Sequence, residues 1–531
     1  MTFVFFRAII FCIKNLFVRQ IKILKICRGY LGILCKICTR LLDFLDNQKQ
    51  MRTKEMNNKF DTQVQVLKYK VLKEVAKKAW DNKLENVIDI PNIIIPGNKP
   101  TMRCCVYKER AILCERVKFA MGGDKENPNV IEVISIACDD CPAGGYEVTN
   151  ACRGCLAHRC QNVCPRNAIY LDNNQHAHID KTKCVECGMC SKVCPYSSII
   201  NYKRPCQSSC KVGAISIGED QSAQIDNSKC IECGACVYQC PFGAISDKSY
   251  IVDVIRLLQN SNNNQNYKVY AIIAPSIASQ FDYATIGQVV TGITKLGFYT
   301  TMEVAVGADM TADVEAKEFA EKQMMTSSCC PAFVKYVENN FPKLKDMVSQ
   351  TLSPMAMLGK YIKQNDASAK VVFIGPCTAK KSEIKKDSVK DYVDSVLTFE
   401  ELQALIDSKD IVLNELPESP LNHASYFGRL FARSGGVTDA LKQALVENNI
   451  SNVDLKPVIC DGIEECKVAL TKAEHNVLGG NFIEGMACCD GCIGGAGCLK
   501  HGQKDKANVD KYGNESIEKT IHSALSSLKN R

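Results

Sequence analysis

The sequence predicts two successive architectures, a small cysteine-rich α+β region and a larger α/β domain. The first prediction rests on sixteen cysteines that lie between residues 138 and 240 at regular spacings. The second rests on apolar runs typical of buried strands, such as 269–275 and 371–377, with helical stretches between them. At 531 residues the chain is too long for one core, and its 46% hydrophobic and 23% charged content is ordinary for a folded protein.

The first fifty residues are an apolar, basic extension that we expect to have no catalytic role. Residues 1–40 hold eight Lys or Arg and no acidic residue, and the whole chain has a formal charge of +8, so the remainder is balanced. This balance does not predict nucleic-acid binding. Charges also interrupt the apolar run well before the ~18 residues needed to span a bilayer. Three interpretations stay open for residues 1–50: a weak membrane-surface contact, a targeting segment, or a non-native extension before a start at Met51.

The N-terminal region, residues 51–135, is predicted to contain a helix and then an extended stretch. Residues 66–80, "VLKYKVLKEVAKKAW", have helical periodicity, whereas residues 87–97, "VIDIPNIIIPG", are rich in β-branched residues. The three cysteines of this region have no ligand-type partners nearby, so we expect them to be structural thiols.

The cysteine-rich region, residues 136–250, contains an internal repeat of 46 residues. The stretch "AHIDKTKCVECGMCSKVCP" recurs as "AQIDNSKCIECGACVYQCP". Both units carry C-x2-C-x2-C-x3-C-P, in which three thiolates hold one 4Fe–4S cubane and the cysteine before proline reaches another. Zinc is the competing interpretation, because C-x2-C pairs also form tetrahedral sites. Duplicated runs of three evenly spaced cysteines before Cys-Pro favour iron–sulfur clusters, and so predict ferredoxin-like 4Fe–4S modules.

The repeat predicts two clusters directly and two more by counting. Each run of three cysteines would be completed by one cysteine from earlier in the chain, giving Cys164 with Cys184, Cys187 and Cys190, and Cys210 with Cys230, Cys233 and Cys236. The remaining eight cysteines would form two further sets, Cys152, Cys155 and Cys160 with Cys194, and Cys138 and Cys141 with Cys206 and Cys240. The sequence therefore predicts two to four accessory 4Fe–4S clusters.

A linker and then the α/β domain follow. The run from Gln259 to Lys268 is polar, and we assign residues 251–267 to the linker. The domain, residues 268–500, alternates strand-like and helical stretches, which predicts βαβ units. Residues 501–531 are polar and are expected to form a C-terminal tail with a surface helix.

Four cysteines of the α/β domain are spaced differently from those of the repeat. Cys330 follows a helical stretch, Cys377 ends a strand, and Cys488 and Cys492 form a C-x3-C pair. Ligands spread in this way suit a cofactor buried between lobes. Four glycines between residues 491 and 497 would let the backbone approach something bulky.

Three stretches of this domain resemble, in order, the signatures of the iron-only (FeFe) hydrogenases: "TSSCCPAF", "GPCTAKKSE" and "EGMACCDGC". The resemblance runs from about residue 136 to 500, and "RCCVYKER" and "ACRGCLAHRC" are similar to the monomeric, multi-cluster clostridial type. It implies a catalytic domain of two α/β lobes with parallel sheets around an H-cluster. That cofactor is a 4Fe–4S cubane joined to a two-iron subsite with carbon monoxide, cyanide and a bridging dithiolate.

The resemblance also implies roles for the cysteines. Cys330, Cys377, Cys488 and Cys492 would hold the cubane, and Cys492 would bridge it to the two-iron unit. Cys329 matches the thiol that passes protons to the bridgehead amine of the dithiolate. Adjacent side chains on extended backbone point to opposite sides, so Cys329 and Cys330 would have different tasks.

Further side chains match the family residue by residue. Lys380 would hydrogen-bond a cyanide, Glu383 is the glutamate after the lysine motif, and Met486 would pack on the subsite. Glu315 and Glu318 match two carboxylates of the proton channel, and their i, i+3 spacing places both on one face of a helix. The segment that lines the diatomic ligands would be Ala274, Pro275 and Ser276.

The sequence departs from the family pattern at a few positions. Gly375 stands where methionine is common, and Met355-Ala356 stand where glutamines are common. The serine of the usual proton path has no exact counterpart, and only Ser349 and Thr351 lie nearby in the sequence. These departures concern rate and pathway more than reaction type.

We expect a ferredoxin hydrogenase that catalyses the reversible reduction of protons to H2, with ferredoxin or a similar electron carrier and hydrogenase maturation proteins as partners. Ligation by thiolates needs a reducing compartment, so the expected location is cytoplasmic. Two alternatives stay open: a sensory hydrogenase, and a non-catalytic iron–sulfur assembly factor that shares the fold. The presence of Cys329 and Lys380 favours the catalytic interpretation.

Overall fold

The computed structural model describes residues 58–142 and 144–529, so the interpretations of residues 1–50 lie outside the described chain. The first described helix, α3 (Gln63–Trp80), begins at a capping box in which the Thr62 and Gln65 side chains each bond the other's backbone N–H. It is followed by α4 (Ile90–Ile94) and α5 (Val106–Ala120). The predicted extension of residues 87–97 is wrong, because Pro91 occupies the first turn of α4, where its missing N–H costs nothing.

One iron–sulfur-type module is built from two separate stretches of chain. Residues 131–142 and 204–247, here called the split module, pair β1 (Ile131–Val133) with β8 (Ile245–Asp247). A second antiparallel ladder joins two neighbouring strands of the same module. Its remaining elements are β6 (Ile215–Ile217), β7 (Ala223–Ile225), α8 (Pro205–Ser209) and α9 (Ala235–Gln239).

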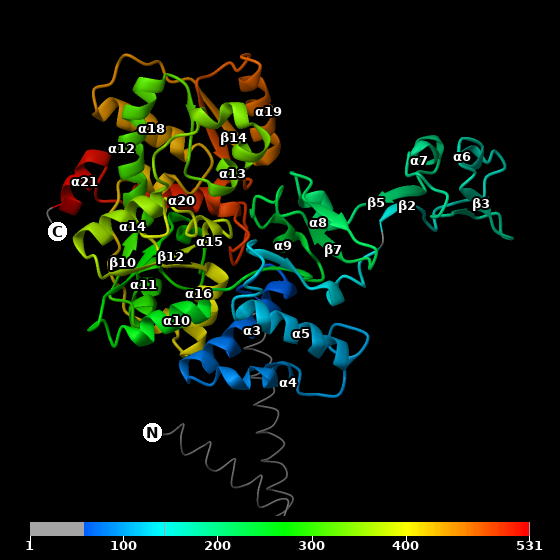
Figure 1. The fold of residues 1–531 in the computed structure, drawn as a ribbon, viewed down its shortest axis with the longest axis horizontal. Coiled ribbons are helices and arrows are strands. Elements are labelled where there is room, and N and C mark those ends of the chain that lie inside the picture. Colours follow the sequence, from blue (N-terminus) through cyan, green and yellow to red (C-terminus); the bar gives the residue numbers. More distant parts are fainter. Residues whose placement is uncertain (1–57, 143, 530–531) are drawn as a thin grey trace, which may run out of the picture. The chain divides into compact units, whose positions relative to one another are not determined.

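A second module, residues 145–202, is inserted between the two stretches of the first. Its ends are held together by β2 (Gly145–Val148), which pairs antiparallel with β5 (Ile199–Tyr202) (Figure 1). Arg204 fastens the junction, since its Nε donates to Pro142 O at 2.9 Å and its Nη1 to Gln221 O at 2.7 Å. The inserted module also contains β3 (Ile169–Leu171), β4 (Ala177–Ile179), α6 (Arg159–Asn162) and α7 (Met189–Val193).

Two parallel sheets organise the remainder of the chain and confirm the predicted two-lobed α/β architecture. One sheet has the order β10-β9-β12-β13 and the other β11-β15-β14, and every pairing in them is parallel. The strands are β9 (Val269–Ile273), β10 (Thr300–Glu303), β11 (Met325–Thr326), β12 (Lys370–Gly375), β13 (Ser395–Thr398), β14 (Pro457–Asp461) and β15 (Phe482–Met486).

Helices surround these sheets (Figure 1). Gly307 lets two of them, α12 and α14, pack closely, because a Cβ there would lie 2.2 Å from Pro354 O. The helices are α10 (Ile251–Asn260), α11 (Ile286–Lys295), α12 (Val304–Lys322), α13 (Pro331–Asn340), α14 (Pro354–Asn365), α15 (Lys380–Glu383), α16 (Phe399–Ser408), α17 (Tyr426–Leu430), α18 (Gly436–Glu447), α19 (Ile463–Glu474), α20 (Asp505–Asn514) and α21 (Ile521–Lys529).

Two segment assignments need correction. Residues 251–260 belong to α10, whose Ile251, Val254 and Ile255 are buried, so the linker prediction is wrong for this part. The polar run that overlaps the end of α10 suggested a linker, and the predicted start of that linker at residue 251 wrongly included the helix. The C-terminal tail forms two helices instead of one surface helix, and Val509 and Ile521 anchor them in the core.

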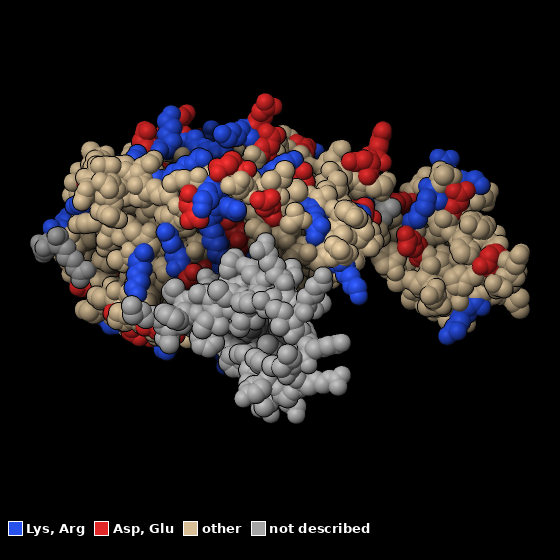
Figure 2. All heavy atoms as spheres, turned by 90° about the horizontal axis from the view of Figure 1, so that it is seen from below, with Lys and Arg blue, Asp and Glu red and all other residues tan. Residues whose placement is uncertain are grey.

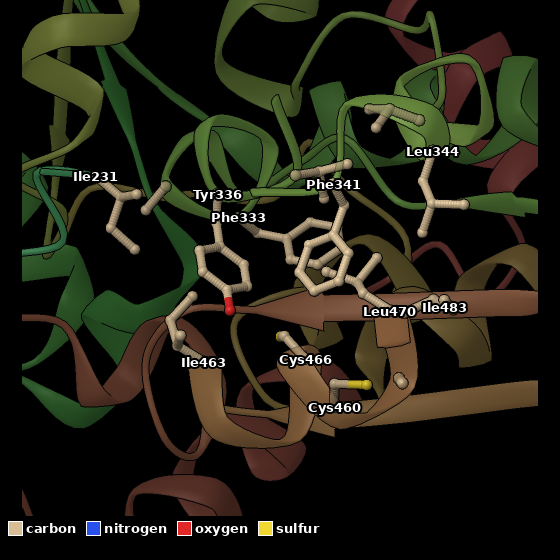
Figure 3. Packing of buried hydrophobic residues seen from close by; sticks show 14 of the residues in the cluster. Ile231, Phe333, Tyr336, Phe341, Leu344, Cys460, Ile463, Cys466, Leu470 and Ile483 are labelled. Atoms are coloured by element: carbon tan, nitrogen blue, oxygen red, sulfur yellow. The ribbon is translucent and has the colours of Figure 1, made fainter. Parts of the chain in front are cut away.

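The lobe of the three-stranded sheet has an aromatic core. Figure 3 shows Phe333 and Tyr336 of α13, and Phe341 just after it, packed over the strand that carries Ile483. Ile231 of the split module packs against the same core. Complete burial of such a side chain contributes about 1.5–3 kcal/mol, so Ile231 helps to hold the split module on this lobe.

No helix in the described ranges is long and apolar enough to cross a membrane.

Candidate cofactor site

A buried cavity lies where strands of both parallel sheets end. Cys377 follows β12, Cys330 follows β11, Cys488 follows β15, and Cys492 lies in the short helix Gly491–Gly494. All four cysteines line the cavity. Open α/β sheets bind ligands at the carboxyl ends of their strands, so the cavity occupies the expected edge.

Glycines bring the cysteine-bearing loops into contact. Gly491 has φ +83°, and a Cβ there would lie 2.7 Å from Ser434 N. A Cβ on Gly495 would lie 2.7 Å from Pro376 O. The loop of Cys492 can therefore pack against the loop that carries Cys377, and the glycines approach neighbouring backbone as well as any ligand.

The chemistry of the four thiols fits an iron cluster. Burial, followed by repulsion from neighbouring cysteines, raises the pKa of Cys377 to about 11 and that of Cys492 to about 12. The same causes raise the pKa of Cys488 well above its ordinary value. Buried thiolates need a compensating positive charge, and a bound iron cluster supplies it. A 4Fe–4S cubane is thus compatible with these residues.

Another part of the cavity wall, at Ser276, offers a polar contact. Ser276 is fully buried, and its Oγ has no hydrogen-bond partner among the described residues. Leaving such a hydroxyl unpaired costs about 1–3 kcal/mol, which a polar ligand in the cavity would offset. Ala274, Pro275 and Met486 line the same cavity, as the resemblance implies.

Lys380 supplies a cation at the cavity. Its Nζ donates to Ser353 Oγ at 3.0 Å and to Cys329 O at 3.3 Å, and it pairs with Glu383 at 2.6 Å. Burial disfavours the charged ammonium, but its attraction to the Glu383 carboxylate is the larger effect and raises the Lys380 pKa. The ammonium therefore remains charged beside a cavity that would receive anionic ligands.

Cys329 lines the cavity without belonging to the set of four. Burial, and then repulsion by Cys330 and Glu315, raises the Cys329 pKa well above its ordinary value. The side chain is therefore an S–H donor at neutral pH.

The two predicted carboxylates lie on α12 in different environments. Burial raises the pKa of Glu315 to about 7, and its Oε1 accepts from Ser328 Oγ at 3.4 Å. Burial opposes ionisation of Glu318 too, but Lys322 at 2.8 Å and the Gln350 N–H at 2.8 Å lower its pKa. One carboxyl is thus poised near neutrality, whereas the other stays ionised.

Ser349 connects the carboxylates. Its hydroxyl donates to Glu318 Oε2 at 2.8 Å, and its interaction with the Glu315 carboxyl lowers the pKa of Glu315 against the effect of burial. Thr351 Oγ1 donates to Glu318 Oε2 at 3.0 Å. In the sequence, these two residues lie only near the position of the family's proton-path serine. Their contact with Glu318 forms when the loop that carries them meets α12 in the folded chain.

Each accessory cysteine set is brought together in the fold. The inserted module has one cavity lined by the complete set that includes Cys152, and another lined by the complete set that includes Cys164. In the split module, burial and repulsion from its three set members raise the pKa of Cys206 to about 11. Burial, and then repulsion from the other three cysteines of its own set and from Cys206, raises the pKa of Cys236 as well. The set of Cys206 and the set of Cys236 therefore lie side by side. We call them set A (Cys152, Cys155, Cys160, Cys194), set B (Cys164, Cys184, Cys187, Cys190), set C (Cys138, Cys141, Cys206, Cys240) and set D (Cys210, Cys230, Cys233, Cys236).

Set D adjoins the four-cysteine cavity. Cys330 is among the thiols that raise the pKa of Cys233, after burial and the nearer cysteines. Between them, Thr378 Oγ1 donates to Glu232 O at 2.8 Å, and Lys335 pairs with the Glu232 carboxylate at 3.0 Å. These contacts join the loops of set D and Cys377.

Within residues 58–142 and 144–529, no three His, Cys, Asp or Glu side chains form a group that could hold a single metal ion. Iron ligation by the five cysteine sets stays a prediction.

A buried ionic network behind the site was missed by sequence reasoning. Lys381 pairs with Asp247 at 2.8 Å and with Glu401 at 2.9 Å, and Lys68 pairs with Asp247 and with Glu400 at 2.6 Å. It ties α3, the end of the split module and α16 to α15, the short helix that carries Lys380. Its partners are far apart in sequence, and "KK" alone gives no signal of burial.

Taken together, the fold and site define a multi-cluster iron–sulfur protein with a cofactor cavity between α/β lobes. Comparison with family models agrees: residues 267–496 match the C-terminal domain of the iron-only hydrogenase large subunit. Residues 151–198 match a 4Fe–4S dicluster domain, and residues 223–246 match a 4Fe–4S binding domain. Residues 267–496 of the chain therefore carry a domain of the iron-only hydrogenase family, and 4Fe–4S domains precede it.

Curated relatives include hydrogenases and an assembly factor. The chain is 30% identical to iron hydrogenase 1 of Clostridium pasteurianum over 50% of its own length and 55% of the relative's. It is 27% identical to the NADP-reducing hydrogenase subunit HndD of Solidesulfovibrio fructosivorans over 49% and 54%. It thus spans about half the length of these two relatives. A shorter match, 32% identical over 23% of the chain and 25% of the relative, is to the cytosolic Fe-S cluster assembly factor NAR1 of Botryotinia fuckeliana.

Solved structures of the FeFe-hydrogenase HydA1 from Chlamydomonas reinhardtii are similar at 21% identity and a TM-score of 0.44, covering 53% of this chain and 94% of theirs.

Proposed function

We propose that this protein is an FeFe-hydrogenase that interconverts two protons and two electrons with H2. The observation that carries the proposal is the thiol of Cys329 beside the four-cysteine cavity, with the Glu315–Ser349–Glu318 chain behind it. A cluster-binding protein without turnover needs the four cysteines, but it does not need a proton-exchanging thiol.

The chain's own residues would bind and orient the cofactor. Cys330, Cys377, Cys488 and Cys492 would hold the cubane, and Cys492 would bridge it to the two-iron unit. When bound, that unit supplies the centre at which protons and electrons combine. The Lys380 ammonium would hold an anionic ligand of the unit by a charge-assisted hydrogen bond.

Protons would travel along α12 and the adjoining loop. Glu318 lies toward the surface end, Ser349 bridges, and Glu315 has a pKa of about 7, suited to both taking and giving a proton near neutrality. Cys329 would exchange the proton between Glu315 and the cavity. The apolar lining of the cavity keeps competing water out.

Electrons would arrive through the accessory sets. Set D lies next to Cys330, and set C lies next to set D. We propose four accessory 4Fe–4S clusters, with ferredoxin or a similar carrier as electron partner and hydrogenase maturation proteins for cofactor insertion. The requirement for free thiolates supports a reducing compartment, for which we propose the cytoplasm.

A second candidate function, iron–sulfur cluster assembly, is supported by the match to NAR1. It requires the cubane cysteines alone, so the two functions assign different importance to Cys329.

A pair of neighbouring substitutions tests the proposal. Cys329→Ala should retain the cofactor but lose nearly all H2 turnover, because the proton donor is gone. Cys330→Ala should lose the cofactor itself. Iron content, EPR and H2 evolution with reduced methyl viologen are the measurements.

Cys489→Ala is the matched control, since Cys489 is also one of two adjacent cysteines but is exposed. It should behave like the unaltered protein. Unimpaired turnover of the Cys329→Ala protein, or equal loss of cofactor in the Cys329 and Cys330 variants, would refute the division of roles.

A further inference from the structure

Cys240, a member of set C, begins a five-residue turn that ends at Ala244. Gly243 N donates to Cys240 O at 3.1 Å, and Ala244 N donates to Cys240 Sγ at 3.2 Å. Gly243 has φ +58°, a conformation that favours glycine. The turn therefore directs one backbone N–H to the sulfur that would ligate iron.

Arg116 of α5 binds this turn. Its Nη2 donates to Gly243 O at 2.7 Å and to Phe242 O at 3.4 Å. A Cβ at Gly243 would collide with the Arg116 guanidinium, so this contact requires glycine as much as the turn does. Gly243 O and Ala244 N belong to the same peptide group. A continuous path of hydrogen bonds thus runs from the guanidinium, through this peptide group, to the Cys240 sulfur.

Arg116 is a buried cation without a carboxylate partner. Figure 2 shows basic side chains at the surface of the molecule, many of them near acidic ones. Arg116, in contrast, is only 5% exposed, its Nε has no hydrogen-bond partner among the described residues, and no described carboxylate pairs with it. Burial lowers its pKa to about 10, against an opposing attraction to Cys240, so the guanidinium stays charged at neutral pH. A buried charge needs compensation, and a cluster held by four thiolates would supply it.

The same kind of turn recurs at two other cysteines, where it has no such cation. Ala168 N donates to Cys164 Sγ at 3.3 Å, and Ala214 N donates to Cys210 Sγ at 3.2 Å. Among the described residues, no side chain donates to the carbonyl of the peptide group that provides either N–H. The buried guanidinium therefore distinguishes the turn of set C from the turns of sets B and D.

We propose that Arg116 raises the reduction potential of the 4Fe–4S cluster at set C by acting through the Gly243–Ala244 peptide group. The inference rests on the proposed accessory clusters. On reduction a cubane gains one electron, and hence one negative charge, while no bond forms or breaks. A buried positive charge stabilises the more negative, reduced form. The guanidinium also polarises the peptide group, which strengthens the hydrogen bond from Ala244 N to the sulfur.

An EPR-monitored redox titration tests the proposal without relying on H2 chemistry. The full chain is loaded with iron and sulfide, and the signal of set C is identified as the one that Cys206→Ser removes. Arg116→Met replaces the guanidinium by an apolar side chain. At a fixed potential the ratio of oxidised to reduced set C cluster should rise by at least about tenfold, a downward shift of about 59 mV. The shift should persist in high salt, because buried charges are screened little.

Arg110→Met is the matched control. Arg110 lies on the same helix, but it donates to Ile95 O at 2.8 Å and to Gly97 O at 3.0 Å instead of to the turn of Cys240. This variant removes the same charge and should change the ratio by less than about twofold. Arg116→Lys keeps a positive charge and should give a ratio between those of the unaltered protein and Arg116→Met. If Arg116→Met loses iron, Arg116→Gln takes its place, since it removes the charge but keeps an amide donor.

Three results would overturn the proposal. One is an iron-loaded Met or Gln variant of Arg116 whose ratio stays within about twofold of that of the unaltered protein. Another is an equal shift in Arg110→Met, and the third is a Cys206→Ser protein that loses no EPR signal. A Lys variant identical to the Met variant would overturn the role of the charge. Absence of H2 evolution from the matured protein would instead overturn the proposed function, while the titration would still decide on Arg116.

Discussion

Glu315 is a proposed proton carrier whose protonation depends on the fold. Burial raises its pKa from the ordinary 4.5 to about 7. Between these pH values the folded protein keeps a proton that the unfolded chain has lost, so the free energy of unfolding falls as pH rises through this window. A shift of this size corresponds to about 3 kcal/mol.

Glu315→Gln should remove this pH dependence, because an amide does not ionise. We expect the denaturation midpoint of the variant to vary less between pH 4.5 and 7 than that of the unaltered protein. H2 turnover should decline by about 10²–10⁴ with the cofactor retained, as for loss of a general acid–base group. A variant with the original pH profile and full turnover would show that Glu315 is only a buried structural group.

At the scale of residues, the sequence predicted which side chains meet at the cavity where these side chains lie in contiguous motifs. "TSSCCPAF" contains two of the five cysteines that line the cavity, and "DVEAKEF" contains both carboxylates at helical spacing. The sequence could not predict that Ser349 connects the carboxylates, nor that Lys381 is buried. Those facts depend on contacts between segments distant in the chain, and no local pattern reports them.

At the scale of elements, the Lys381 network joins the split module to the lobe of the four-stranded sheet. Its carboxylates come from the end of β8 and from α16, where Glu401 also caps the helix by accepting from Thr398 N. Burial opposes ionisation of Asp247, but Lys381 and Lys68 lower its pKa. Removing Lys381 leaves the Glu401 carboxylate buried without a cation and leaves Asp247 with Lys68 alone.

Lys381→Met should therefore destabilise the fold by about 3–5 kcal/mol. The measurement is the shift of the denaturation midpoint, together with susceptibility to proteolysis. Lys390→Met is the matched control, because Lys390 forms an exposed pair with Asp387 at 2.6 Å, worth about 0–1 kcal/mol. Equal stability of the two variants would contradict a structural role for the network.

Strand and helix periodicity predicted β9, β12 and the parallel α/β architecture. It did not reveal the insertion of one iron–sulfur module in another. The 46-residue repeat shows similarity between units, but the nesting depends on the pairing of β2 with β5 and of β1 with β8, which join residues far apart in the sequence. Such long-range pairing leaves no local periodicity to read.

At the scale of the whole molecule, four accessory sets predict about sixteen iron atoms outside the four-cysteine cavity. Cys152→Ser and Cys206→Ser change one ligand each of set A and set C. Each variant should lose about four iron atoms and one EPR signal, leaving the other clusters in place. Protein with markedly fewer accessory irons, or a Cys206→Ser variant with unchanged iron content, would contradict the four-cluster assignment.

The central claim is that the cavity between the lobes binds a two-iron unit and not a cubane alone. The infrared spectrum of protein produced together with hydrogenase maturation proteins tests it most directly. We predict bands of metal-bound carbon monoxide and cyanide, accompanied by H2 evolution. A protein with a full iron load that shows neither the bands nor the activity would contradict the hydrogenase assignment and favour the assembly-factor alternative.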